Sequence, residues 1–205
     1  MERKSIWDTT VSHGDLLRRV WKHLELGVKD RHHPFHTPVF ATIGEGQAEL
    51  RSVILRRFFK KPRELAFHAH RGSPKVKQVS DNPKVSWLFY HPEEKLQLRI
   101  RGIATVLARG EIADEQWKQT SLFGRRCYIG MAPSQQTEKP SHGMPSNLVD
   151  REPLRDESEI GRENFCVVSS TIDYIDCVEL DVRGHRRCFF DWTNKDAQKM
   201  GWMTP

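Results

Sequence analysis

The chain has few cysteines, and none of them is paired in the sequence. Its 205 residues include four cysteines, at positions 127, 166, 177 and 188, and no Cys-x-x-Cys pair. This spacing predicts neither a zinc knot nor a disulfide framework, so we expect reduced thiols that are mostly buried. Long apolar runs are also missing, and residues 1–4 are not followed by the apolar segment of a signal peptide. We therefore expect a cytoplasmic protein with no membrane partner.

A long basic tract is absent too, although the formal net charge is +6. This charge favours an acidic partner, which could be nucleic acid, a membrane surface or a phosphorylated small molecule. The Lys and Arg residues are spread along the chain and often lie near acids, which favours a local anion site over a nucleic-acid stripe. We expect a small-molecule ligand and no nucleic acid. The length predicts a single domain over residues 1–205.

Hydrophobic periodicity predicts a mainly β protein with α additions. A helix is expected over residues 15–29, because apolar residues recur there at helical spacing, and Ser12 and Asp15 resemble the start of a capping box. A second helix is expected from Asp114, as its cap, to about Phe123. Strands are expected over residues 39–43, 49–57, 64–70, 85–90, 96–107, 165–171, 175–182 and 185–190. Many short strands with few helices indicate a barrel.

Three further segments have distinct patterns. The run over residues 85–90 is almost wholly apolar and is expected to be covered on both sides. Residues 131–164 are rich in Pro, Ser, Glu and Arg and are expected to form a long loop, which is either a lid or a mobile insertion. Residues 165–191 are expected to form a C-terminal hairpin that turns at Arg183 and Gly184.

Residues 67–75 indicate an anion site. A hydrophobic strand is followed by a turn, then by Ser73 as N-cap and Pro74 at the first helical position. The unpaired N–H groups of the first turn, the helix dipole, the Ser73 hydroxyl and the Lys75 cation favour an anion. An ordinary capped surface helix remains the alternative. Because residues 51–56 and 96–102 add basic and amide side chains on neighbouring strands, we interpret the three segments as a phosphate cradle.

The sequence offers no complete catalytic or metal motif. Residues 31–36 contain three histidines, but Pro34 argues against a helix and no carboxylate or thiol spacing completes a site, so no metal is predicted. The aromatic residues Trp87, Phe89 and Tyr90 either stack on a flavin or base or belong to the core, which we favour. Arg99 and Arg101 either line a site or form a solvated strand face. No nucleophile, catalytic triad or general base can be identified from the sequence, so the catalytic residues are unknown.

The order of these segments resembles the pyridoxamine 5'-phosphate oxidase family of FMN-binding split barrels. The family strand Arg-x-Val-Leu-Leu-Lys is similar to residues 51–56, its Phe-Tyr-Thr-Asn-x-x-Ser-Arg-Lys segment to residues 67–75, and its Gln-Val-Arg-x-x-Gly strand to residues 97–102. A Ser-x-Gln-Ser element has a counterpart at residues 134–137, and the Arg-x-His-x-Arg signature of the C-terminal hairpin at residues 183–187. The resemblance therefore spans roughly residues 51–190.

The resemblance implies a split β-barrel with flanking helices and a bound FMN. Arg51, Ser73 and Lys75 would bind the FMN phosphate, with Arg56 nearby. The other implied FMN contacts come from Ser52, Val53, His68, Ala69, Gln97, Gln136, Thr137 and Arg187, the last of which would approach the isoalloxazine ring. Arg183 and His185 would contact the substrate, although His185 is alternatively a strand histidine facing water. Because the family holds its flavin between two subunits, the resemblance also implies a homodimer.

Departures from the family pattern limit what is implied about the reaction. The family's substrate-phosphate motif, Tyr-x-x-x-Arg-x-x-x-Ser, falls on Gln119, Phe123 and Cys127, and Arg125 and Arg126 lie nearby at the wrong spacing. Three further family residues are replaced: a lysine by Arg56, an arginine by Pro74 and a tryptophan by Cys177. The chain therefore looks like an oxidase-related FMN-dependent oxidoreductase rather than a true pyridoxamine 5'-phosphate oxidase. The alternatives are a haem-binding or flavin-reducing split barrel, a flavin carrier without turnover, and a nucleic-acid-binding module.

Overall fold

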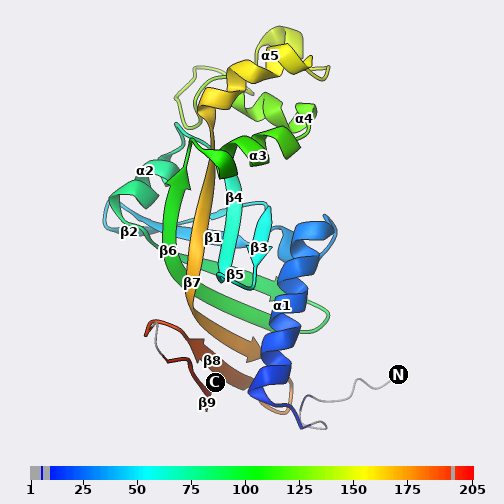
Figure 1. Cartoon of the computed structure of the whole chain (residues 1–205), viewed down its shortest axis with the longest axis vertical. Helices are drawn as coiled ribbons and strands as arrows, with labels where there is room; N and C mark the ends of the chain where they lie inside the picture. Colours follow the sequence, from blue (N-terminus) through cyan, green and yellow to red (C-terminus); the bar gives the residue numbers. More distant parts are fainter. Residues whose placement is uncertain (1–5, 7–9, 195–196) are drawn as a thin grey trace. The chain divides into compact units, whose positions relative to one another are not determined.

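The computed structural model describes residues 6, 10–194 and 197–205. The expectation for residues 1–4 lies outside this part of the chain. The described chain divides into two compact units (Figure 1). The first unit contains Met1–Ala66, Lys84–Ala104 and Ser170–Pro205, and the second contains Phe67–Pro83 and Thr105–Ser169. Whether they act as the single domain expected from length stays a prediction. No helix in the described part of the chain is both long and apolar enough to cross a membrane.

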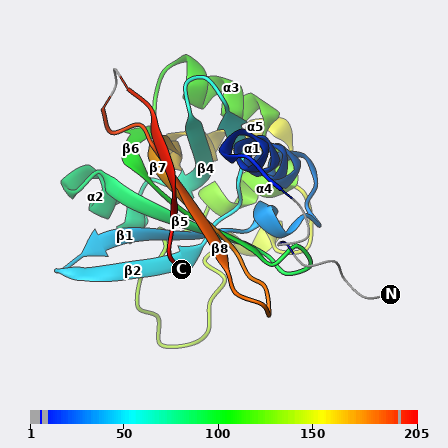
Figure 2. The ribbon, with the colours of Figure 1, turned by 90° about the horizontal axis from the view of Figure 1, so that it is seen from below.

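Antiparallel strands build most of the first unit, which agrees with the predicted mainly β fold. The strand order is β2-β1-β5-β6-β7-β4-β3, and β8 and β9 extend the sheet from β7. Figure 2 shows β1, β2 and β5 side by side, in agreement with their pairing. The strands are β1 (Val39–Gly44), β2 (Gln47–Ser52), β3 (Arg57–Phe59), β4 (Glu64–His70), β5 (Lys84–His91), β6 (Leu96–Leu107), β7 (Phe165–Glu179), β8 (Arg186–Asp191) and β9 (Lys199–Met203).

Several strand predictions were wrong in their limits. Residues 49–57 are not one strand, because β2 ends at Ser52 and the next amides bond to residues before β1: the Val53 N–H donates to the Pro38 carbonyl at 3.0 Å and the Leu55 N–H to the His36 carbonyl at 2.9 Å. At the other end of the chain, β7 is continuous from residue 165 to residue 179. The chain therefore ends in the antiparallel set β7-β8-β9 rather than in a hairpin alone.

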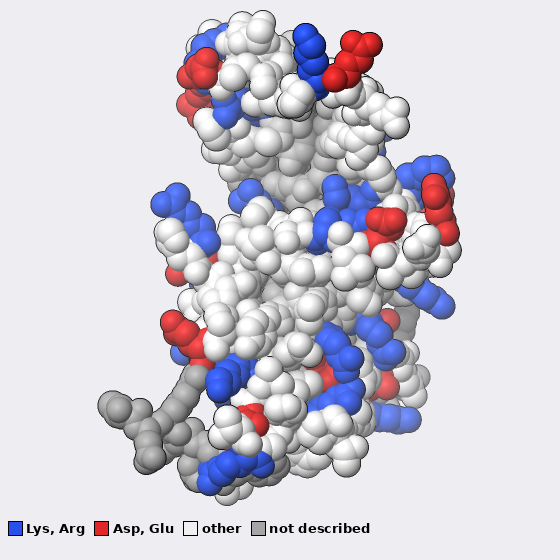
Figure 3. Space-filling model, turned by 180° about the vertical axis from the view of Figure 1, so that it is seen from behind, with Lys and Arg blue, Asp and Glu red and all other residues white. Residues whose placement is uncertain are grey.

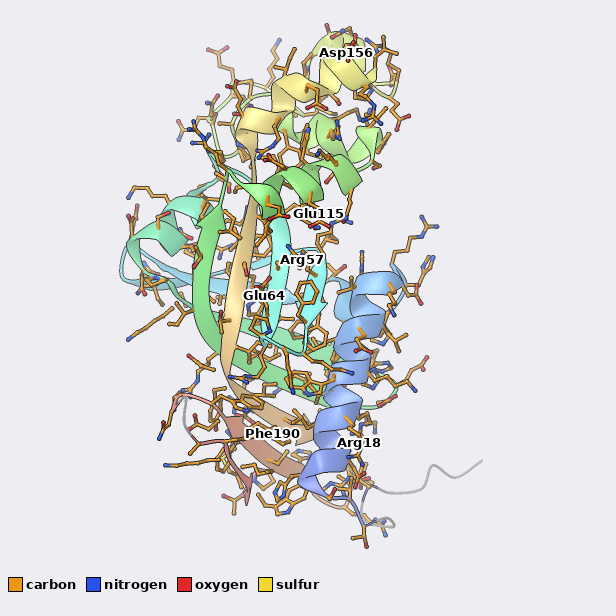
Figure 4. All side chains as sticks on the ribbon, viewed as in Figure 1. Arg18, Arg57, Glu64, Glu115, Asp156 and Phe190 are labelled. Carbon is orange, nitrogen blue, oxygen red and sulfur yellow. The ribbon has the colours of Figure 1, made fainter. Side chains whose placement is uncertain are left out.

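Helix α1 (His13–Lys29) confirms the expected capping box. The Asp15 N–H donates to Ser12 Oγ at 3.1 Å, and the Ser12 N–H donates to the Asp15 carboxylate at 3.1 Å. Because Ser12 is the cap, the helix begins two residues before the predicted start. Its apolar stripe, which includes Leu16 and Val20, is buried. On the polar side of α1, the Arg18 side chain points to solvent (Figure 4). Phe190 of β8, which is also labelled there, is fully buried.

Strand β5 shows that one face of the first unit's sheet is uncovered. Val85, Trp87 and Phe89 are buried, whereas Leu88 is 36% and Tyr90 is 45% exposed. The prediction that β5 is covered on both sides was therefore wrong for the single chain. The strand pairing places these exposed side chains on one face with residues of β1, β2 and β6. This open face contains Val39, Ala41, Ile43, Leu50, Ser86, Leu88, Tyr90, Gln97, Arg99, Arg101 and Ile103.

Helices and turns make up most of the second unit. They are α2 (Pro74–Asp81), α3 (Glu111–Gln119), α4 (Leu122–Arg125) and α5 (Arg155–Glu159), with single turns η3 (Arg126–Tyr128), η4 (Ser146–Leu148) and η5 (Ile160–Asn164). The expected loop over residues 131–164 therefore ends in helical structure. Helix α3 begins at Glu111 rather than Asp114, because Gly110 with φ +90° serves as its N-cap, and it ends before Phe123. The rings of Trp117, Tyr128 and Phe165 pack together in the core of this unit.

Candidate functional site

The start of α2, in the second unit, has the features expected of an anion site. Ser73 is the N-cap and Pro74 the first helical residue, as predicted. However, the Ser73 hydroxyl makes no capping hydrogen bond; it is buried and finds no partner among the described residues. His70 Nδ1 accepts a hydrogen bond from the Gly72 N–H at 3.0 Å. The other ring nitrogen of His70, Nε2, is buried and has no partner among the described residues. Burial and then the Lys75 cation lower the pKa of His70. Orphaned polar atoms beside a cation at a helix start indicate an anionic ligand.

The other predicted residues of the second unit have mixed surroundings. His68 Nε2 lies 3.1 Å from Gln116 Oε1, and the ring packs edge-on against Phe165. The Ala69 carbonyl accepts from the Cys166 thiol at 3.3 Å. Thr137 lines a cavity of about 360 Å³ in the loop between η3 and η4, and its hydroxyl donates to the Lys139 carbonyl at 2.8 Å. Gln136 is exposed in the same loop. Their roles as FMN contacts stay predictions.

In the first unit, Arg51 is held at the end of β2. It pairs with Phe40, so its side chain shares the face of the sheet that carries the core. Arg51 Nη1 donates to Thr42 Oγ1 at 2.6 Å, which fixes the guanidinium next to the strand. The neighbouring predicted residues differ in exposure, because Ser52 and Arg56 are exposed and Val53 is buried. A fixed and partly exposed guanidinium is suited to bind phosphate.

A cavity of about 480 Å³ lies in the first unit, where the open face meets β7 and β8. Its charged wall is formed by Arg99, Arg101, Asp176 and Arg187. Arg187 donates to both carboxylate oxygens of Asp176, at 3.0 and 2.8 Å, and Arg99 also donates to Asp176. Burial would raise the pKa of Asp176, but the hydrogen bonds from Arg187 and Arg99 bring it below its usual value. This carboxylate is therefore charged and binds two guanidinium groups.

Apolar and aromatic groups complete the same cavity. Val39, Ala41 and Leu88 contribute apolar surface, and Tyr174 forms part of the wall. The Arg101 guanidinium stacks on the Tyr174 ring, 4.0 Å from its centroid. Flat surfaces next to guanidinium groups suit a planar ligand that carries carbonyl groups or negative charge. Sequence reasoning identified Arg187 but missed Asp176, whose signal was an acid placed between the apolar residues Ile175 and Cys177.

The predicted substrate residues lie in the turn that joins β7 to β8. The Arg183 N–H donates to the Asp181 carboxylate at 2.9 Å, and His185 Nδ1 accepts the Asp181 N–H at 3.3 Å. His185 therefore precedes β8 rather than lying in it, which corrects the predicted strand limit. Both residues are exposed. Their contact with a substrate stays a prediction.

Arg125 and Arg126, which lie near the missing substrate-phosphate motif, have structural roles. Arg125 is 1% exposed and donates to the Trp117 carbonyl at 2.9 Å, to Ser158 Oγ at 3.0 Å and to Glu159 at 2.6 Å. Arg126 donates to the carbonyls of Leu148 and Val149, both at 2.9 Å. These contacts hold the helical segments of the second unit together. The Arg125 guanidinium is therefore fully used within the fold, whereas Arg126 also lines the cavity of about 360 Å³.

A histidine cluster in the first unit joins three separate segments. Of the histidines in residues 31–36, only His33 takes part, together with His23 of α1 and His91 of β5. The Phe35 N–H donates to His33 Nδ1 at 3.1 Å, which places the proton of neutral His33 on Nε2. His33 Nε2 lies 3.2 Å from His23 Nδ1, and His23 Nε2 lies 2.9 Å from Glu94. The ring nitrogens of His33 and His23 that face the cluster are therefore already used in hydrogen bonds. A metal-bound histidine normally donates from its other nitrogen, so we assign no metal here.

Surface charge shows no single basic stripe on the face drawn in Figure 3. Lys and Arg residues there alternate with Asp and Glu residues and with uncharged surface. Uniform backbone binding of nucleic acid relies on a clustered basic patch or stripe. Whether the acidic partner is a small molecule or nucleic acid stays a prediction.

Comparison with known proteins identifies the fold and finds a family match for part of the chain. Residues 18–108 match the family described as pyridoxamine 5'-phosphate oxidase, FMN-binding domain. This region contains the motifs at residues 51–56, 67–75 and 97–102 and ends before those at residues 134–137 and 183–187. A search of the curated proteins found no match.

Two solved structures resemble the whole chain. A pyridoxamine 5'-phosphate oxidase-related, FMN-binding protein from Nostoc punctiforme has a TM-score of 0.70 at 18% identity, covering 96% of this chain and 100% of that one. PhzG from Burkholderia lata, solved with tetrahydrophenazine-1-carboxylic acid, has a TM-score of 0.66 at 20% identity, covering 97% and 96%. The expected split-barrel fold is thereby confirmed. Residues 18–108 are therefore similar to the FMN-binding domain of pyridoxamine 5'-phosphate oxidase, and the chain has the fold of split-barrel proteins related to that oxidase.

Proposed function

We propose that the protein binds FMN and acts as an FMN-dependent oxidoreductase on a small molecule. The observation that carries this proposal is the start of α2, where the buried Ser73 hydroxyl has no partner among the described residues and Lys75 follows in the first turn. These groups match the needs of a phosphate, which binds to hydroxyl and N–H donors and to cations. The residue types therefore fit the phosphate end of FMN.

The proposed contacts with the rest of FMN come from the first unit. A flavin ring offers carbonyl oxygens and ring nitrogens, which amide and guanidinium groups recognise. Gln97 supplies an amide on the open face, and Arg187 supplies a guanidinium in the wall of the 480 Å³ cavity. When bound, FMN supplies two-electron chemistry, in which a reduced small molecule gives up a hydride equivalent and a second substrate, an electron acceptor such as dioxygen, takes the electrons. The protein's residues bind and orient the cofactor.

We further propose that the protein is a homodimer with the flavin between its subunits. Large apolar side chains on the open face are exposed in the single chain, including Leu50 at 62%, Tyr90 at 45% and Ile103 at 44%. Contiguous exposed apolar surface of this kind is typical of an interface. A second copy of the chain on this face would cover these residues and bring another set of cofactor contacts to the Gln97 side of the sheet.

The experiment that tests the function is a titration of the protein with FMN and with riboflavin, followed by flavin fluorescence. We expect FMN to bind more tightly than riboflavin, because riboflavin lacks the phosphate. Reduction of the bound flavin by candidate donors, followed by reoxidation in air, would then test turnover. Equal affinity for the two flavins would contradict the phosphate assignment, and no affinity for either would contradict the cofactor assignment.

A further inference from the structure

The carboxylate of Asp176 organises the charged wall of the 480 Å³ cavity. Asp176 is 5% exposed, and its two oxygens accept Arg187 Nε at 3.0 Å and Arg187 Nη2 at 2.8 Å. Such a two-point contact fixes the plane of a guanidinium as well as its position. Arg99 donates to the same carboxylate from β6, so one acid on β7 connects side chains from three strands.

The two arginines remain accessible from the cavity side. The side chain of Arg99 is 53% exposed and that of Arg187 is 26% exposed, whereas that of Asp176 is 7% exposed. Asp176 lines the cavity but is almost fully buried, so the arginines present more of the accessible charge there. The wall holds the guanidinium groups of Arg99, Arg101 and Arg187 and one carboxylate, so its net charge is +2.

Fold stability alone does not explain an ionised acid at this position. A buried charge must be desolvated, and replacing a buried ion pair by apolar residues is often neutral or stabilising. The neighbours of Asp176 in β7, Ile175 and Cys177, are apolar and buried. An acid in this strand is better explained by the orientation that it imposes on its partners.

We propose that Asp176 is a positioning residue that holds the Arg187 guanidinium in place to stabilise the negative charge of a reduced flavin ring. This inference rests on the proposed FMN function. A fixed cation next to the ring binds the reduced, anionic flavin more tightly than the oxidised, neutral flavin. Asp176 acts through Arg187 rather than by touching the cofactor.

A double-mutant cycle on the flavin-loaded protein tests this inference. The variants are Asp176→Asn, Arg187→Gln and the double variant, and the readout is the midpoint potential of the bound flavin. We expect Asp176→Asn to lower the preference for reduced flavin about tenfold, which corresponds to a shift of about 30 mV to more negative potential. Arg187→Gln should shift the potential in the same direction, and Asp176→Asn should have no further effect in the Arg187→Gln background.

The matched control is Asp114→Asn, which breaks an Arg–Asp pair of the second unit, in which Arg162 Nε donates to Asp114 at 3.1 Å. This variant should leave the potential unchanged. The inference would be overturned if Asp176→Asn left the midpoint potential unchanged or made it more positive. It would also be overturned if Asp176→Asn shifted the potential by the same amount in the Arg187→Gln background.

A measurement without cofactor separates this inference from the proposed function. The ion pair should protect Arg187 from modification by phenylglyoxal, measured by mass spectrometry on the flavin-free protein. We expect the rate at Arg187 to rise several-fold in Asp176→Asn and to stay unchanged in Asp114→Asn. An unchanged rate in Asp176→Asn would overturn the positioning role, even if the protein binds FMN. If the wild-type protein binds no FMN, the functional proposal fails, and with it the proposed effect on the flavin.

Discussion

Arg51 and Gln97 lie on opposite faces of the same antiparallel sheet, although both belong to strands that resemble FMN-binding motifs. Arg51 pairs with Phe40 on the face that carries the core, whereas Gln97 pairs with Tyr90 on the open face. Directly paired residues share a face, so the sheet of one chain does not turn both side chains toward one ligand. Two copies of the chain would resolve this, if each flavin took Arg51 from one copy and Gln97 from the other.

A charge on the open face should therefore prevent dimer formation. Leu88 is 36% exposed in the single chain and lies opposite Val39 of β1. We expect Leu88→Glu to convert the dimer to a monomer, because the interface would bury an unpaired carboxylate. Light scattering after gel filtration measures the mass. Val182→Glu is the control, since Val182 is 94% exposed in the turn after β7. A monomeric wild-type protein, or a Leu88→Glu variant that stays dimeric, would contradict the proposal.

Removing either proposed phosphate cation should weaken FMN binding. We expect Arg51→Ala and Lys75→Ala each to cost about 1.5 to 3 kcal/mol, the usual contribution of a charge-assisted hydrogen bond. Riboflavin binding should change little, because riboflavin has no phosphate. The matched control is Lys77→Ala, which removes an exposed cation of the same helix that pairs with Asp81 at 2.5 Å. Unchanged FMN affinity in both variants, with the fold intact, would contradict the phosphate assignment.

Gly102 should be intolerant of a side chain. A Cβ built at this position overlaps the carbonyl oxygen of Thr171, where β6 and β7 approach closely. We expect Gly102→Ala to lower the free energy of unfolding by about 1 to 3 kcal/mol, the usual effect of overpacking. Urea unfolding measures the change. Gly14→Ala in α1 is the control, because the nearest atom to its added Cβ is 3.5 Å away. Equal stability of the two variants would show that the strands can separate at no cost.

The histidine cluster should make the protein sensitive to mild acid. Burial lowers the pKa of His23 and of His33 below the ordinary value of 6.5, and Glu94 only partly offsets this for His23. The unfolded chain therefore takes up protons more readily, so stability is fully present above pH 6.5 and is lost as the pH falls below it. Glu94 adds to the loss only below its ordinary pKa of 4.5.

Urea unfolding at pH 7.5, 6.5 and 5.5 tests this dependence. We expect the free energy of unfolding to fall between pH 6.5 and 5.5 and to fall less steeply in His23→Gln. The control is His32→Gln, because His32 is exposed and outside the cluster. A wild-type stability that stays constant or rises on acidification would contradict the buried, neutral state of the cluster.

Local signals in the sequence predicted the elements that depend on neighbouring residues. Ser12 and Asp15 specified the start of α1, and Ser73 with Pro74 specified the start of α2. The start of α3 was missed because its cap is Gly110, which uses a positive φ and no side-chain contact. Strand β5 was misread because its outer face also carries the large side chains Leu88 and Tyr90, and a single sequence does not show whether such a face is covered within the same chain.

The candidate site could be predicted only where a motif is contiguous. The α2 start and the basic residues of β2 and β8 follow from short patterns. The contact between Asp176 and Arg187 requires the pairing of β7 with β8, and the cluster of His23, His33 and His91 requires segments far apart in the sequence. Arg125 and Arg126 lie near the missing substrate-phosphate motif at the wrong spacing, and their packing within the second unit could not be predicted from the sequence.

The most direct test of the FMN assignment is the visible absorption spectrum of the purified protein, with identification of the released chromophore. We expect the two visible absorption bands of oxidised flavin, and FMN as the released species. A Soret band from haem, or a colourless protein that also fails to bind added FMN, would contradict the FMN assignment.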